Sequence, residues 1–224
     1  MHNWLDHVVK TEDGSLSLNH PAHNQWFHSD SGAHTESTYL YVKASGIEEK
    51  FSQMNIRVAD IGLGLGYNVL ATVAAWFENS YSKDLHITSF EHDEDLWKTI
   101  SSGKNKLTQD YPDFWWSLCQ NKSLTHANGS KCNWHVVIGN IHDFDFQKAN
   151  YDFVWHDPFS QDVNPTLWTE EYFEKLSKAL KRDSVLMTYS VRREVRENLK
   201  KCGFEVNKIP TPTRKKNWLK AVML

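Results

Sequence analysis

The 224-residue sequence predicts an α/β protein in which helices cover both faces of a mostly parallel seven-stranded sheet. Two observations predict this fold class. From Ile56 onward, apolar stretches of strand length alternate with amphipathic stretches of helix length, as they do in parallel sheets. The last two apolar stretches follow one another without a helix between them, which predicts an antiparallel hairpin at the end of that sheet.

The individual elements follow from the hydrophobic pattern. We expect residues 1–54 to form a small N-terminal extension of short strands and one helix, over residues 33–45, and residues 55–224 to form the core. The expected core strands are residues 56–62, 85–91, 134–140, 151–157, 184–190, 204–210 and 218–224. The expected core helices are residues 67–79, 93–102, 111–122, 167–180 and 193–203. Such folds bind ligands beyond the carboxyl ends of their strands, so residues that follow strands are the candidates for chemistry.

Composition and charge narrow the class of protein. Hydrophobic residues make up 40% of the chain and charged residues 24%, as in ordinary globular domains. The net charge of −3 conceals a basic segment, residues 181–224, which holds twelve Lys or Arg and four Asp or Glu. A basic segment on an acidic body indicates a polyanionic partner.

The expected location is the cytoplasm, with no membrane partner. Three scattered cysteines, none in a CxxC pair, favour a reducing compartment. The longest uncharged apolar stretch is too short to cross a bilayer. The first residues lack the basic and apolar segments of a signal peptide.

Twelve histidines raise the question of a metal site. His20, His23, His28 and His34 lie near one another in the sequence. Their spacing matches no familiar zinc pattern, and no cysteine lies near them. The sequence therefore predicts no metal site.

A glycine-rich turn, "ADIGLGLGYN", follows the first core strand. Glycines at such a turn let the backbone pass close to a cofactor before the helix begins. A dinucleotide fingerprint would need its third glycine at position 67, which is Tyr67 here. The GxGxG spacing is instead typical of S-adenosylmethionine-dependent methyltransferases, whose cofactor has no pyrophosphate. We therefore expect a class I, Rossmann-like methyltransferase fold that binds S-adenosylmethionine through Asp60, Gly62, Gly64, Gly66 and Asn68.

Two polar residues follow the next strands. Glu91 ends the second core strand, where a carboxylate can accept hydrogen bonds from both ribose hydroxyls of the cofactor. The alternative is an ordinary solvated glutamate. Asn140 follows the third core strand, where its carboxamide can pair with the adenine edge, and the alternative is a turn residue.

The fourth core strand leads into "HDPFSQDVNPTLW", residues 156–168, whose "DPF" resembles the (D/N)PP(Y/F) loop of amino-directed methyltransferases. Methyl transfer needs a neutral, oriented and desolvated amine. We expect Asp157 to face the cofactor's methyl group and accept the amine's hydrogens, Pro158 to stiffen the turn, and Phe159 to wall the pocket or stack on a base. The alternative is a plain Asp-Pro turn. Trp168 is expected in the core rather than as a stacking platform.

Reference pKa values limit what Asp157 can do as a base. With about 3.9 for Asp and about 10.4 for an alkylamine, complete proton transfer is uphill by roughly 9 kcal/mol. Orientation of an already neutral amine, or strongly shifted pKa values, is therefore expected.

These segments resemble the methyltransferase domain of the bifunctional tRNA 5-methylaminomethyl-2-thiouridine biosynthesis proteins, the MnmC family. "HDPFSQDVNPTLWTEEYF" is similar to the family's "DGFxPxxNPxxWxxxxF", and "ADIGLGLGYN" to its "ExGFGTGLN". The resemblance spans nearly the whole chain and is weakest over residues 101–132. It implies methyl transfer from S-adenosylmethionine to the aminomethyl group of a tRNA wobble uridine, with Asp157 facing the amine. It also implies a place for Glu36 near the methionine moiety, with a plain helix N-terminal acid as the alternative.

The sequence departs from the family pattern at three places. Here "DPF" replaces "DGF", Gly139–Asn140 replaces "GD", and "TPTRKKN" replaces "GxGRKRE". Bifunctional family members also continue into a flavin-dependent oxidase domain. We therefore expect this chain to perform the methylation alone, and the aminomethyl intermediate to come from another enzyme or route.

The basic C-terminal segment agrees with a tRNA partner. Two clusters are expected to bind phosphates around the anticodon loop: Arg193, Arg196 and Lys200 on one helix face, and Arg214, Lys215 and Lys216. The alternative is a solvated surface. Two other functions stay open: methylation of a small-molecule or protein amine, and a non-catalytic tRNA-binding module with a degenerate cofactor site.

Overall fold

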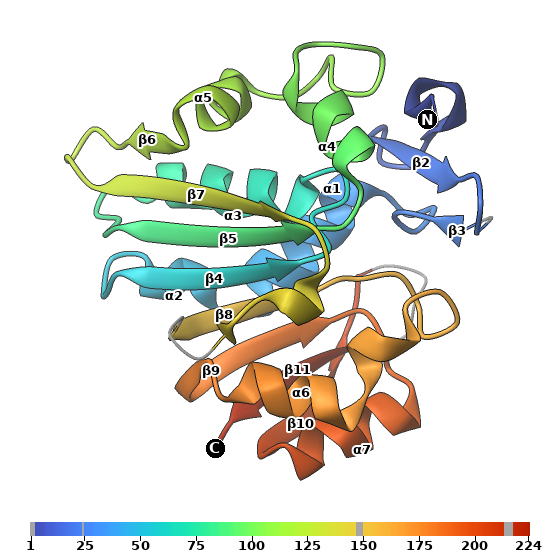
Figure 1. Ribbon diagram of the computed structural model, residues 1–224. Helices are drawn as coiled ribbons and strands as arrows, with labels where there is room; N and C mark the ends of the chain where they lie inside the picture. Colours follow the sequence, from blue (N-terminus) through green and yellow to red (C-terminus); the bar gives the residue numbers. More distant parts are fainter. Residues whose placement is uncertain (1–2, 24, 147–149, 213–216) are drawn as a thin grey trace.

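The computed structural model describes residues 3–23, 25–146, 150–212 and 217–224, and its main feature is an eight-stranded sheet in the order β10-β11-β9-β8-β4-β5-β7-β6 (Figure 1). Strands β4, β5, β7, β8 and β9 run parallel, and β11 lies antiparallel between β9 and β10. The expected C-terminal hairpin is therefore present. The strands are β4 (Ile56–Ile61), β5 (Leu85–Glu91), β6 (Ser123–Thr125), β7 (Lys131–Ile138), β8 (Tyr151–His156), β9 (Leu180–Thr188), β10 (Phe204–Pro210) and β11 (Asn217–Met223).

The sheet has one strand more than the seven expected. Strand β6 pairs antiparallel with β7 at the edge of the sheet opposite the C-terminal hairpin. It spans three residues inside the irregular segment 101–132, so it is too short to produce a periodic signal. The predicted fold class, a mostly parallel sheet with helices on both faces, is nevertheless confirmed.

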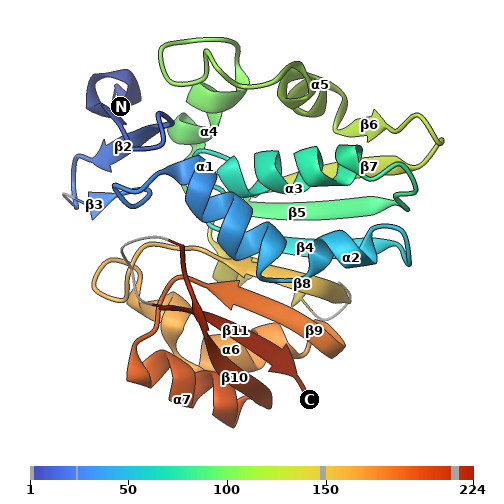
Figure 2. The ribbon, with the colours of Figure 1, turned by 180° about the vertical axis from the view of Figure 1, so that it is seen from behind.

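Helices cover both faces of the sheet (Figures 1 and 2). Because successive strand residues point to opposite faces, Val58 packs into one buried cluster and its neighbour Ala59 into the other. Trp155 and Val154 divide in the same way. The first cluster lies under α1 (Ala33–Glu36), η2 (Ser37–Lys43), α2 (Ile47–Lys50), α3 (Tyr67–Glu78), α4 (Glu94–Ser101) and α5 (Asp113–Asn121), and the second under η3 (Ile141–Asp143), η5 (Pro165–Trp168), α6 (Glu170–Ser177) and α7 (Arg193–Lys201).

Two expected helices are divided in the structure. The helix expected over residues 33–45 is α-helical over its first turn, α1, and continues as a π-helix, η2, in which Ala44 N donates to Tyr39 O five residues earlier. The helix expected over residues 167–180 is broken at Thr169, whose side chain accepts a hydrogen bond from Tyr172 N and so starts α6. The preceding turn, η5, buries Trp168, as expected for a core residue.

The N-terminal residues form a separate small sheet. It contains β1 (Val8–Lys10), β2 (Leu16–His20) and β3 (Gln25–Trp26), preceded by the short helix η1 (Trp4–His7). The Tyr67 hydroxyl of α3 donates to Leu16 O and accepts from Leu16 N, which ties β2 to the start of α3. Strands β2 and β3 consequently lie beyond the carboxyl ends of the central strands (Figure 1). Within the described ranges, no helix is both long enough and apolar enough to span a membrane.

Candidate active site

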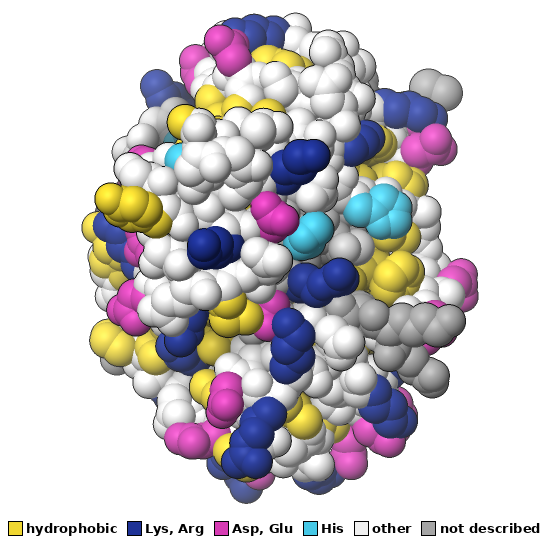
Figure 3. All heavy atoms as spheres, turned by 90° about the vertical axis from the view of Figure 1, so that its left-hand side faces the viewer, with side chains coloured by type: hydrophobic (Ala, Val, Ile, Leu, Met, Phe, Trp, Pro, Cys, Tyr) yellow, Lys and Arg dark blue, Asp and Glu magenta, His cyan; other side chains and the backbone are white. Residues whose placement is uncertain are grey.

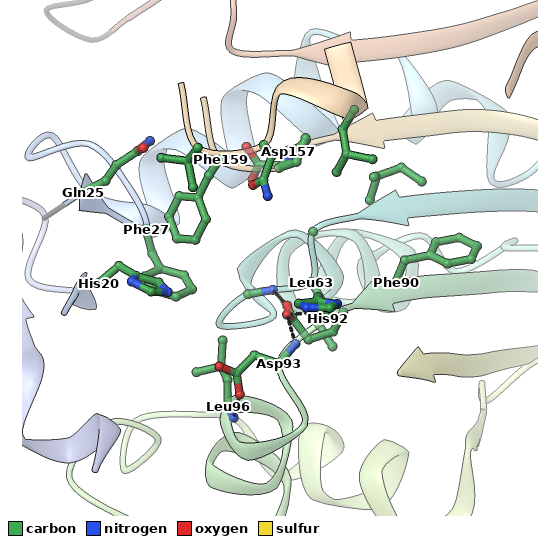
Figure 4. A pocket seen from close by; sticks show the side chains of 18 of the residues that line it. His20, Gln25, Phe27, Leu63, Phe90, His92, Asp93, Leu96, Asp157 and Phe159 are labelled. Atoms are coloured by element: carbon green, nitrogen blue, oxygen red, sulfur yellow. Dashed lines mark hydrogen bonds between the residues drawn. The ribbon is translucent and has the colours of Figure 1, made fainter. Parts of the chain in front are cut away.

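A cavity of about 720 Å³ lies at the carboxyl ends of β4, β5, β7 and β8. Its wall includes the residues that follow these strands and residues from β2 and β3 (Figure 4), together with residues of α1 and α3. The volume is within the range of small-molecule pockets. Most of the predicted site residues line it, namely Glu36, Gly62, Gly64, Asn68, Glu91, Asn140, Asp157, Pro158 and Phe159.

The glycine turn and the "DPF" segment touch each other in the cavity wall. Asp157 N donates to Ile61 O at 2.9 Å, which extends the β4–β8 pairing by one bond. Gly62 has a φ of +87°, and a Cβ there would lie 2.8 Å from Asp157 O. A residue with a side chain would therefore push the two segments apart.

Asp157 is half-buried and held by an oriented amide. Asn68 Nδ2 donates to Asp157 Oδ2 at 3.0 Å, and the Ser37 hydroxyl donates to Asn68 Oδ1 at 2.7 Å. Burial in the cavity wall, reinforced by the charge of Glu36, raises the pKa of Asp157 to about 8. Against an alkylamine of pKa about 10.4, proton transfer to Asp157 then costs roughly 3 kcal/mol instead of 9. Both orienting an amine and accepting its proton are within reach of this carboxylate.

The backbone after Asp157 is braced from two sides. The Tyr189 hydroxyl donates to Pro158 O at 2.9 Å, and Trp168 Nε1 donates to Phe159 O at 2.9 Å. Tyr189 directly follows β9 and Trp168 ends η5, so two separate parts of the chain brace this loop.

Glu91 connects the glycine turn to the turn after β5. Its Oε2 accepts from Gly64 N at 2.9 Å, and its Oε1 accepts from His92 N and Asp93 N at 2.7 and 2.8 Å. Burial raises its pKa. It is thus not an ordinary solvated glutamate, and Oε2, which accepts only one of these three bonds, has a second lone pair for a ribose hydroxyl. The ribose contact itself stays a prediction.

Two residues expected at the cofactor lie behind the cavity wall. Asp60 is fully buried beneath α3, where Ser89 Oγ donates to its Oδ2 at 2.7 Å and burial raises its pKa to about 7. Its side chain shares the strand face of Val58, which points away from the cavity. Gly66 begins α3 with a φ of +78°, and a Cβ there would overlap the ring of Trp115. Both residues support the turn from behind.

The cavity wall is acidic. Glu36, Glu91, Asp93 and Asp157 line it, and no Lys or Arg is among the described residues that do so. A cationic ligand is favoured here because it would stabilise the ionised forms of these carboxyl groups, whereas phosphate groups are disfavoured.

Comparison with known proteins identifies the family. The family described as S-adenosyl-L-methionine-dependent methyltransferase matches residues 102–224. The chain belongs to this family. S-adenosylmethionine is therefore the cofactor of this methyltransferase.

Individual relatives agree with the family. The tRNA 5-methylaminomethyl-2-thiouridine biosynthesis bifunctional protein MnmC of Azoarcus sp. is 30% identical over 84% of this chain and 31% of that protein. An uncharacterized protein of Methanocaldococcus jannaschii is 28% identical over 94% of this chain and 58% of its own length. The chain thus spans less than two thirds of either curated relative.

Solved structures show the same fold. MnmC2 from Aquifex aeolicus matches with a TM-score of 0.80 and 27% identity, covering 96% of this chain and 70% of that one. Human methyltransferase-like protein 13, solved with S-adenosylhomocysteine, matches with a TM-score of 0.54 and 12% identity, over 86% of this chain and 82% of that one. The second match concerns the fold alone.

The residues present fit the cofactor. S-adenosylmethionine carries a sulfonium cation and no phosphate. This agrees with a cavity that carboxyl groups line and that has no Lys or Arg among its described lining residues. The close approach at Gly62 keeps the glycine turn and Asp157 on one wall, where a methyl group and its acceptor would meet.

Two further predicted cofactor residues of the methyltransferase are placed as follows. Asn140 lines the cavity, and its Oδ1 accepts from His142 N at 3.0 Å, so it does act as a turn residue. Its contact with adenine stays a prediction. Glu36 lies in the first turn of its helix, as the alternative of a helix N-terminal acid has it, and its Oε2 accepts from both the backbone N and the hydroxyl of Ser29 at 3.2 Å. Only 7% of Glu36 is exposed, so it is not a plain surface acid.

Sequence reasoning missed the wall that the N-terminal strands supply. Trp4, His20, His23, Gln25 and Phe27 all line the cavity. The histidines were considered for a metal site, whereas His20 and His23 lie ring against ring at 4.4 Å. His28 and His34 contact the ring of Tyr67, and His28 also lines the cavity. The density of aromatic and histidine residues over 20–28 was the available signal, but nothing local says that this segment reaches the cavity.

The predicted basic face of α7 is present in part. Val195 and Leu199 are buried as expected, and Arg193 and Lys200 are exposed, whereas Arg196 is half-buried. Lys200 lies 3.8 Å from Glu197 on the same helix. Arg214, Lys215 and Lys216 lie outside the described residues.

Ion pairs neutralise some of the basic C-terminal segment. On the face at the amino ends of the parallel strands, Lys and Arg are interspersed with acidic and neutral side chains (Figure 3). Arg192 lies beside Asp162 at 2.8 Å, close to the cavity loops. Lys181 also pairs with Asp152, and Lys201 pairs with Glu170.

Proposed function

We propose that this methyltransferase transfers a methyl group from S-adenosylmethionine to the exocyclic amine of 5-aminomethyl-2-thiouridine at the wobble position of tRNA. The observation that carries this proposal is the position of Asp157, which touches the glycine turn in an acidic cavity. Similarity to the MnmC protein over 84% of the chain and to MnmC2 over 96% supports the substrate class.

The cavity residues suit an in-line displacement at nitrogen. S-adenosylmethionine supplies an electrophilic methyl group on a sulfonium. An N–C bond forms at the amine as the C–S bond breaks, and the proton leaves to Asp157 or to solvent. Asp157 accepts the amine's hydrogens and so directs its lone pair, while Asn68 holds the carboxylate in place.

The cofactor contacts are proposed residue by residue. Gly62 and Gly64 pass along the methionine and ribose, Glu91 binds the ribose hydroxyls, Asn140 faces the adenine and Glu36 faces the methionine amino group. Their shared place in one cavity wall supports this assignment. Within the chain, we propose residues 1–54 as an extension to a methyltransferase core of residues 55–224.

The tRNA phosphates are proposed to bind outside the cavity. The acidic wall disfavours them, whereas Arg193 starts α7 a few residues after Tyr189 of the cavity lining. Lys200 lies roughly 10 Å further along the helix. Arg196, Arg214, Lys215 and Lys216 complete the proposed contact surface. A tRNA substrate implies activity in the cytoplasm, and the aminomethyl intermediate is proposed to come from a separate enzyme.

Mass spectrometry of tRNA nucleosides tests the function. A strain that lacks the gene should accumulate aminomethyluridine nucleosides and lose their methylated forms. The wild-type gene should restore the methylated form, whereas the Asp157→Ala variant should not. An unchanged nucleoside profile in the deletion strain would reject the proposal.

A further inference from the structure

We propose that the N-terminal strands form a stacking subsite for the uracil ring of the substrate, with His20, Phe27 and Phe159 as its aromatic wall and Gln25 at the ring edge. This inference rests on the proposed function and assigns the recognition of the base to the N-terminal residues together with Phe159 of the "DPF" segment.

The position of the acceptor nitrogen determines where the uracil ring of the substrate lies. If Asp157 holds the amine, the pyrimidine lies one methylene away, against the residues around Asp157 on the side away from the glycine turn. His20 and Phe159 lie on this side, and Leu63 and His92 lie on the other (Figure 4). The ring of Phe27 spans the distance between them, because a Cβ on Gly64 would lie 3.3 Å from it. The substrate ring therefore meets the aromatic side.

The three rings form one connected surface. The centroids of Phe27 and Phe159 lie 4.8 Å apart, and those of His20 and Phe159 lie 5.4 Å apart, with nearly perpendicular planes. The planes of His20 and Phe27 are within 16° of each other. All three residues are half-buried and line the cavity, so part of each faces the space where a base would stack.

A polar side chain accompanies this wall. Ser160 Oγ donates to Gln25 Oε1 at 3.2 Å, which joins β3 to the loop after Asp157. With Oε1 held there, Nε2 is the donor available for a carbonyl oxygen of uracil. An aromatic wall with one amide fits a flat, neutral base better than a flexible aliphatic amine. No Lys or Arg is among the described residues that line the cavity, which fits a splayed base whose phosphate stays outside.

Exchanging the ring of His20 tests the subsite. The substrate is an anticodon stem-loop that carries 5-aminomethyl-2-thiouridine. His20→Leu should raise its KM by roughly 5- to 150-fold, the equivalent of one lost base–aromatic stack. His20→Phe keeps an aromatic face and should restore most of the affinity. Calorimetry should give an unchanged Kd for S-adenosylmethionine in both variants, and His135→Leu, the same change at an exposed position on β7 outside the cavity, should behave as wild type.

The outcomes separate this inference from the proposed function. If wild type methylates the stem-loop and His20→Leu does so with the same KM, the stacking subsite is overturned and the function stands. If wild type binds S-adenosylmethionine but does not methylate the stem-loop, the function fails and the subsite with it. Should His20→Leu fail to bind the cofactor, Phe159→Leu carries the same expectation, and an unchanged KM in that variant overturns the subsite.

Discussion

At Asp157, opposing influences act on one carboxylate. Burial and the charge of Glu36 raise its pKa, whereas the hydrogen bond from Asn68 lowers it, and the resulting pKa is about 8. The carboxyl group of the ligand-free protein is therefore mostly neutral at pH 7. A cation bound beside it would favour the ionised form, so the residue becomes a better acceptor when both ligands are present.

Removing this carboxyl should separate catalysis from cofactor binding. Asp157→Ala should lower turnover by about 10²-fold or more, because the amine is no longer oriented. Its Kd for S-adenosylmethionine should change by less than about threefold, under 1 kcal/mol, because the cost of ionising Asp157 at pH 7 offsets much of its attraction for a cation. Methyl transfer assays and calorimetry measure the two quantities.

A nearby aspartate provides the control. Asp162 lies on the same loop, is exposed and pairs with Arg192, so Asp162→Ala should stay near wild type in both assays. Wild-type turnover in Asp157→Ala would remove Asp157 from the mechanism.

At the scale of elements, the site depends on two loops that follow neighbouring parallel strands. Strands β4 and β8 pair in parallel, so their carboxyl ends deliver Gly62 and Asp157 to the same edge. The π-helix η2 contributes from the other side, because it starts at Ser37, which orients Asn68. Each of these contacts joins elements that are far apart in the sequence.

The close approach of the two loops gives a prediction about Gly62. Gly62→Ala combines the strain of a positive φ, about 1–2 kcal/mol, with a Cβ 2.8 Å from Asp157 O. It should lower stability by more than that strain alone and weaken S-adenosylmethionine binding. Denaturant unfolding and calorimetry measure both effects.

The same substitution at Gly129 separates the backbone strain of a positive φ from the contact between the two loops. Its φ is +90°, and a Cβ there would meet nothing within 4 Å, so Gly129→Ala should show the strain without the lost affinity. Equal effects in the two variants would show that the approach of the loops does not matter.

At the scale of the whole molecule, buried titratable groups link stability to pH. Asp60 and Asp157 have pKa values raised to about 7 and about 8, so near neutral pH the folded state binds more protons than the unfolded state. Their contribution to stability is complete below the ordinary pKa of 3.8 and declines as pH rises through the folded values. His156 acts in the opposite direction, because burial lowers its pKa from 6.5 to about 3 and stability gains with pH up to about 6.5.

The free energy of unfolding of the ligand-free protein should therefore fall between pH 6.5 and 8. Above pH 6.5 the contribution of His156 is complete, whereas each raised carboxyl lowers stability by up to about 1.4 kcal/mol per pH unit. Asp60→Asn keeps an acceptor for Ser89 and should flatten this decline. Asp113→Asn, at a side chain that is 99% exposed, should not. A wild-type stability that rises over this range would contradict the buried-carboxyl account.

The sequence by itself determined the order and type of most elements. Strands β5 and β10 have the bounds that periodicity predicts, and the C-terminal hairpin follows from two consecutive apolar stretches. The glycine turn and Asp157 were recognisable because they occupy fixed places at strand ends. These features depend on neighbouring residues, whose spacing is visible in one chain.

Only the tertiary structure decided which residues share the cavity. It placed Asp60 beneath α3, gave both oxygens of Glu91 to backbone donors, and brought His20 and Phe27 from the N-terminal strands to face Phe159. It also raised the pKa of Asp157, which its residue type alone leaves near 3.8. Packing sets these properties through contacts between distant segments, and the hydrophobic period of each segment carries no information about its distant partners.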